Sequence, residues 1–112
     1  MNKEEHFLEK YLKPCTSVSA QFPLLVGDDC AVISLSEDLL ISSDNSVIDV
    51  HFPANLDAYY VAYRALAVAA SDIIAMGAYP EGYLLNITHP EPSDEWFKKF
   101  SYGIKDFNED YE

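Results

Sequence analysis

Three short stretches of the sequence place aspartates beside apolar runs. Gly27-Asp28-Asp29-Cys30 precedes Ala31–Ile33, Ser42-Ser43-Asp44 follows Leu40-Ile41, and Asp72 lies within the apolar segment 68–76. Two like charges about 4 Å apart repel by roughly 4 kcal/mol at an effective dielectric constant near 20, so acids gathered at one place call for cations. Carboxylate and hydroxyl oxygens are the ligands that magnesium prefers. If the fold brings these stretches together, they predict one magnesium site.

Each candidate residue also has an ordinary structural interpretation. Gly-Asp-Asp is common in turns, because an aspartate side chain accepts hydrogen bonds from nearby amides. On a helix, Asp72 would share a face with apolar residues, and a carboxylate there would lose water at a cost of several kcal/mol unless it were paired. Its partner would be a metal, a backbone amide or a cation such as Arg64. His51, between Val50 and Phe52, is by default a core or turn histidine.

Composition restricts the partners of the chain. Its 112 residues are 49% hydrophobic, enough for one folded domain, and the net charge is −12. Such a charge repels nucleic acids and anionic membrane surfaces, so bound metal cations would have to offset it at any site for a phosphorylated small molecule. The sequence has no secretory signal and no run of 18 apolar residues. We therefore expect a cytoplasmic protein that binds neither nucleic acid nor membranes.

The order of elements predicts an α+β fold, with a two-layer arrangement in which helices cover one face of a sheet. Apolar spacing indicates helices over about 3–13, from Asp57 to Gly77, and from Ser93 onward, where Trp96, Phe97, Phe100, Ile104 and Phe107 form an apolar stripe. β-branched and apolar runs indicate strands. An antiparallel hairpin of the second and third strands would bring Asp28, Asp29 and Asp44 to one end. The expected strands are 24–26, 30–35, 39–43, 46–52 and 83–88.

Taken together, these stretches resemble the thiamine-monophosphate kinase family. The resemblance covers about residues 24–107, and its most specific part is Ser71-Asp72 followed by Ala75-Met76-Gly77-Ala78-Tyr79-Pro80. Single motifs are shared with aminoimidazole ribonucleotide synthetase-like proteins. The resemblance implies the N-terminal domain of that superfamily, with a sheet that completes a barrel across a homodimer. It also implies ATP-dependent, Mg²⁺-assisted phosphorylation of thiamine monophosphate to thiamine diphosphate.

The resemblance also assigns individual residues. Asp29, Ser42, Ser43, Asp44 and Asp72 match metal ligands, His51 matches a substrate contact, and Tyr102 falls where the family places a residue near the nucleotide. The chain departs from the family pattern at Ser43 (usually Thr), Asp49 (usually Gly) and Ala69 (often Asn).

The family's Gly-Gly-Asp motif would follow Glu112, so residues 1–112 are expected to be one truncated N-terminal ATP- and metal-binding domain that lacks its C-terminal domain and is inactive alone. Two alternatives remain open. One is another ATP-dependent synthetase of the superfamily, for selenophosphate or aminoimidazole ribonucleotide. The other is a non-catalytic acidic interaction domain.

Overall fold

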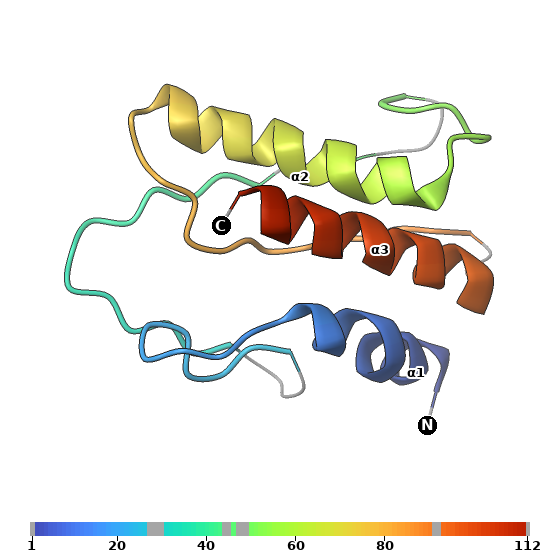
Figure 1. Ribbon diagram of the computed structural model, residues 1–112, viewed down its shortest axis with the longest axis horizontal. Helices are drawn as coiled ribbons and strands as arrows, with labels where there is room; N and C mark the ends of the chain where they lie inside the picture. Colours follow the sequence, from blue (N-terminus) through green and yellow to red (C-terminus); the bar gives the residue numbers. More distant parts are fainter. Residues whose placement is uncertain (1, 27–30, 44–45, 47–49, 91–92, 112) are drawn as a thin grey trace. The chain divides into compact units, whose positions relative to one another are not determined.

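The computed structural model describes residues 2–26, 31–43, 46, 50–90 and 93–111 (Figure 1). The chain divides into two compact units, Met1–Leu39 and Leu40–Glu112. Among the described residues, no helix is long and apolar enough to cross a membrane.

The first unit begins with the predicted amphipathic helix. The Asn2 side chain accepts a hydrogen bond from the Glu5 amide at 2.8 Å and so caps the first turn. α-Helical geometry ends at Phe7, and the π-helical turn after it gives way to a 3₁₀ turn that contains Pro14, which has no N–H to donate. The helical segment consists of α1 (Lys3–Phe7), the π-helical turn η1 (Leu8–Leu12) and η2 (Lys13–Cys15).

Helix α2 (Ala58–Ala75) begins and ends where the sequence predicts. The Asp57 side chain accepts a hydrogen bond from the Tyr59 amide at 2.9 Å, which is an N-cap. At the other end Gly77 adopts a φ of +78°, and Gly77 and Ala78 donate to the carbonyls of Ile74 and Ile73. This is a Schellman motif, which uses glycine because a left-handed conformation costs it nothing.

Helix α3 (Asp94–Asp110) is capped by the Ser93 hydroxyl, which accepts a hydrogen bond from the Trp96 amide at 3.1 Å. Two acidic residues in its first turn are favourable beside the positive end of the helix dipole. The predicted apolar stripe is largely confirmed, because Trp96 is half-buried and the other four residues are buried: Phe97, Phe100, Ile104 and Phe107.

Within the second unit, α2 and α3 lie side by side and run in the same direction (Figure 1). Gly103 faces the Tyr59 carbonyl, and the rings of Tyr63 and Phe107 lie 5.7 Å apart, so facing positions differ by 44 in residue number. Since α3 ends at Asp110, its last residue lies opposite residue 66 of α2. Residues 67–75 of α2 therefore extend beyond α3.

The return from the end of α2 to the start of α3 is an extended segment, 78–90, that runs back beside α3 (Figure 1). Tyr83 fixes part of it. Its hydroxyl donates to Asn108 Oδ1 at 3.1 Å, and its ring lies 6.3 Å from that of Phe107. Because α2 and α3 are parallel, a short loop could not join them.

The predicted α+β sheet, and with it the barrel across a dimer, is wrong for the part of the chain that is described. No strand occurs there. An isolated antiparallel bridge joins Leu24 to Val32, with an N–H···O distance of 2.8 Å, and Val26 and Phe52 are also bridge residues. A β-branched, apolar segment suits a sheet, but it becomes a strand only where another segment pairs with its amides and carbonyls. Within the predicted strands, Ile41 and Leu84 are each 72% exposed.

Candidate functional site

Asp72, the strongest single candidate, lies in the last turns of α2. Its neighbour Ser71 donates its hydroxyl to the Val68 carbonyl at 2.7 Å. Asp72 is exposed, whereas Ala70, half a turn earlier on α2, is buried. The expectation that its carboxylate is desolvated among apolar residues is therefore wrong. Among the described residues it forms no ion pair with Arg64, one of the possible partners, and no side-chain hydrogen bond, and its side chain is exposed.

The other predicted metal ligands are only partly visible. Ser42 and Ser43 are exposed residues of the second unit, while Asp29 and Asp44 lie outside the described residues. In the described part of the chain, no hydrogen bond joins either serine to Asp72, and no three His, Cys, Asp or Glu residues gather closely enough to hold a metal. The donor types suit magnesium, but a complete site needs the two aspartates. The magnesium site stays a prediction.

The two predicted ligand contacts lie on different elements. His51 is exposed in a turn before α2. Tyr102, 47% exposed, lies on α3 level with residue 58, where α2 begins. Asp72 is 14 residues further along α2, which corresponds to about 21 Å at 1.5 Å per residue. The fold does not bring Tyr102 and Asp72 together.

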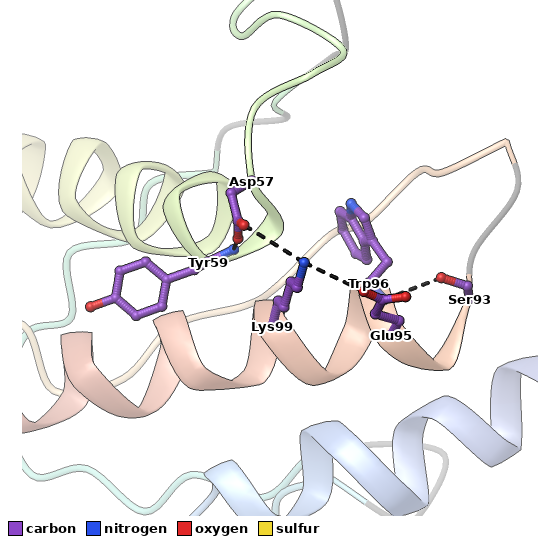
Figure 2. A network of polar contacts seen from close by, with 6 residues as sticks. All are labelled: Asp57, Tyr59, Ser93, Glu95, Trp96 and Lys99. Atoms are coloured by element: carbon purple, nitrogen blue, oxygen red, sulfur yellow. Dashed lines mark hydrogen bonds and ion pairs between the residues drawn. The ribbon is translucent and has the colours of Figure 1, made fainter.

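A shallow cavity of about 350 Å³ opens where α2 and α3 begin. Figure 2 shows the polar contacts beside it. Lys99 Nζ lies 3.9 Å from Asp57 Oδ2 and 3.5 Å from Glu95 Oε1, so one ammonium group bridges the first turns of both helices. The cavity is lined by Asn55, Leu56, Asp57, Ala58, Ser93, Glu95, Trp96 and Lys99.

The polar residues around this cavity have structural roles, as helix caps and ion pairs where α2 and α3 begin. Ser93 Oγ is engaged as a helix cap, and none of the residues that line the cavity is a histidine. Lys99 and Asp57 are about half exposed and Glu95 is 81% exposed, and exposed pairs contribute little to stability. The sequence identifies Asp57 and Ser93 as caps, but not their proximity, since nothing local encodes that the two helices are parallel.

A ladder of tyrosine–aspartate hydrogen bonds joins α2 to α3. Tyr59 Oη donates to Asp106 Oδ2 and Tyr63 Oη donates to Asp110 Oδ2, both at 2.5 Å. These bonds to carboxylates are the main reason why the pKa of each tyrosine is raised to about 12, because ionisation would bring two negative charges together. Sequence reasoning missed the ladder. Its signal is the shared spacing, four residues between the tyrosines and four between the aspartates.

Comparison with known proteins shows which proteins this chain is similar to. Several relatives are named thiamine-monophosphate kinase, among them two bacterial proteins and an archaeal one of lower identity. The protein of Escherichia coli (strain K12) is 36% identical over 105 residues, 92% of this chain and 32% of the relative. That of Salmonella typhimurium is 44% identical over 81 residues, 70% of this chain and 25% of the relative. That of Methanocaldococcus jannaschii is 33% identical over 91 residues, 78% of this chain and 28% of the relative.

The chain thus spans about a third or less of the length of these relatives. The resemblance to thiamine-monophosphate kinases expected from the sequence motifs is confirmed. Residues 27–112 match the family described as AIR synthase related protein, N-terminal domain. Since the match covers most of the chain, this protein belongs to that family.

Proposed function

We propose that this chain is the N-terminal part of an ATP-dependent kinase that converts thiamine monophosphate to thiamine diphosphate. The observation that carries the proposal is the 36% identity to a thiamine-monophosphate kinase over 92% of the chain. The matched region includes the motif Ser71-Asp72. In the proposed reaction a phosphate oxygen of thiamine monophosphate bonds to the γ-phosphorus of ATP, the bond from that phosphorus to the β,γ-bridging oxygen breaks, and ADP leaves.

Positioning and electrostatic stabilisation account for most of the catalysis in phosphoryl transfer. The chain's own contribution would therefore be to position the metal ions and the two phosphorylated ligands. Mg²⁺, when bound, would neutralise the phosphoryl oxygens. His51 would contact the substrate. Tyr102 lies far along the helix pair from Asp72, so it would contact the end of the nucleotide remote from the metal. The proposed metal ligands are Asp29, Ser42, Ser43, Asp44 and Asp72.

We further propose that residues 1–112 form the ATP- and metal-binding domain of a longer cytoplasmic enzyme that works as a homodimer. The greater length of the relatives supports the first part. The number of large apolar side chains that are exposed supports an association, because an interface would bury some of them. Among them, Ile41 and Met76 are each 72% exposed. Light scattering on the purified chain tests the dimer, and a monomer at high concentration would count against it.

The function is tested with a chimera. Residues of the Escherichia coli kinase that match this chain are replaced by the chain itself, and thiamine diphosphate formation from ATP and thiamine monophosphate is measured. We expect activity, and its loss in the Asp72→Asn chimera. Isothermal titration of the 112-residue chain with Mg²⁺ gives a second readout. A chain that binds Mg²⁺ equally well with and without Asp72→Asn would instead be the non-catalytic acidic domain.

Another ATP-dependent synthetase is the second candidate, because the matching family is described as AIR synthase related. The same chimera tests it. If ATP hydrolysis occurs without thiamine diphosphate and depends on a different acceptor, selenide or the precursor of aminoimidazole ribonucleotide, the synthetase is correct.

A further inference from the structure

Helix α2 has an outer face that is poorly suited to water. This outer face consists of the exposed residues of α2 apart from Asp72, namely Tyr60, Arg64, Val68, Ser71, Ile74 and Ala75. We propose that the outer face is an interaction surface, and that in the intact enzyme it packs against the part for which this chain has no counterpart. The inference rests on the part of the proposed function in which residues 1–112 belong to a longer protein.

The residues of the outer face form one stripe along α2. Successive members are separated mostly by three or four residues, which places them along one side of an α-helix. The buried residues Ala62, Leu66 and Ala70 recur every four residues on a different side, and Ala62 lies close to Gly103 of α3. Helix α2 therefore has one side that is covered and one side that is exposed over most of its length.

The exposed side of α2 is apolar, whereas the exposed side of α3 is charged. On the outer face Tyr60 is 60% exposed, Ile74 50% and Val68 43%, and the charged member is Arg64. Every exposed residue of α3 except Tyr102 is charged. Helices at a protein surface ordinarily carry polar and charged residues on the side that faces water. Helix α3 fits that pattern and α2 does not, which indicates that α2 is covered on both sides in the intact protein.

The length of the relatives favours an occupant from the same polypeptide. The chain matches 32% of the Escherichia coli kinase and 28% of the Methanocaldococcus jannaschii kinase, so most of such an enzyme lies outside it. That part would be covalently attached, and a short flexible linker holds attached parts at a millimolar effective concentration. A second copy would compete only at the lower concentration of the free protein. We expect the attached part to present apolar side chains to Val68 and Ile74 and a carboxylate to Arg64.

Thiol labelling of the 112-residue chain and of the chimera with the Escherichia coli kinase tests the inference. Val68→Cys and Ile74→Cys each place a thiol on the outer face, and the control Lys105→Cys places one at an exposed position of α3. Reaction rates with a maleimide are measured by mass spectrometry of the separate peptides. We expect the chimera to slow labelling at both outer-face positions on the order of tenfold or more relative to the 112-residue chain, because labelling then requires local opening. The Lys105→Cys rate should be the same in both proteins.

Unchanged labelling of the outer face in the chimera would overturn the inference. Slow labelling of Val68→Cys already in the 112-residue chain would also overturn it: a second copy is the occupant if the protection rises with protein concentration, and another part of these 112 residues if it does not. A chimera that does not melt cooperatively would show that the two parts do not fit together. Thiamine diphosphate formation is measured separately. A chimera that protects the outer face but forms no thiamine diphosphate would refute the proposed activity and leave this inference standing, and an active chimera with an unprotected outer face would do the reverse.

Discussion

Gly103 of α3 lies against the carbonyl oxygen of Tyr59 in α2, so closely that a β-carbon on Gly103 would be 2.2 Å from that oxygen and 3.0 Å from the Ala62 β-carbon. The obstacle is backbone, which cannot move aside as a flexible side chain could. The close parallel packing of the two helices therefore depends on the missing side chain.

Gly103→Ala should destabilise the chain although alanine is the better helix former. The propensity gain is about 1 kcal/mol, and overpacking of a tight contact costs about 1–3 kcal/mol. We expect the free energy of unfolding, measured by urea titration and circular dichroism, to fall. Lys105→Ala, at an exposed position of the same helix, should change it by less than about 0.5 kcal/mol. A more stable Gly103→Ala variant would show that the helices do not approach this closely.

Gly77 offers the opposite case, since a β-carbon there would meet nothing within 4 Å but the backbone has a φ of +78°. Gly77→Ala should cost about 1 kcal/mol through the left-handed conformation alone. Gly77→Asn should cost less, because asparagine tolerates that conformation. Equal losses for alanine and asparagine in the same urea titration would contradict the conformational explanation.

The caps of α2 and α3 can be separated from the ion pairs beside them. Ser93→Ala removes the acceptor for the Trp96 amide and should cost about 1 kcal/mol. Asp57→Asn keeps an acceptor for the Tyr59 amide and removes only the charge that lies 3.9 Å from Lys99. Because that pair is exposed, we expect less than about 0.5 kcal/mol from Asp57→Asn. Thermal melts of both variants in low and high salt would check this difference.

The tyrosine–aspartate ladder predicts a specific loss of stability at alkaline pH. The pKa of Tyr59 and of Tyr63 is raised from 10.0 to about 12 in the folded chain. Between these values the folded chain retains protons that the unfolded chain has released, so this contribution to stability is complete below pH 10 and is lost as the pH rises towards 12. Melting temperatures of the chain should fall more steeply over that range than those of the Tyr59→Phe, Tyr63→Phe variant. Identical slopes would contradict the prediction, and Tyr60→Phe is the matched control.

The helices of this chain could be predicted because their signals are local. Asp57, Gly77 and Ser93 each act on amides or carbonyls within a few residues, and all three stand where α2 and α3 begin or end. The absence of strands from the described residues could not be predicted in this way. Apolar, β-branched runs such as Leu39–Ser43 show what a segment could do when paired, whereas pairing depends on residues far away in the chain.

The candidate site illustrates the same limit. Asp72 was placed correctly on a helix, but its exposure depends on which side of α2 other parts of the chain cover, which is a property of the tertiary structure. The sequence contains a signal of the ladder, because Tyr59 and Tyr63 have the same spacing as Asp106 and Asp110. This spacing predicts the two hydrogen bonds only when the helices are known to be parallel. Asp29 and Asp44 lie outside the described residues, so their assignment stays a prediction.

The constant separation of 44 residues between facing positions of α2 and α3 has a consequence for how fast the chain folds. In an antiparallel helical hairpin the first contacts form across a short loop, and each contact brings the next pair closer. Here every contact between the helices requires closure of the same long loop before any apolar burial offsets the entropy lost. We therefore expect the second unit to fold more slowly than a helical hairpin of equal size.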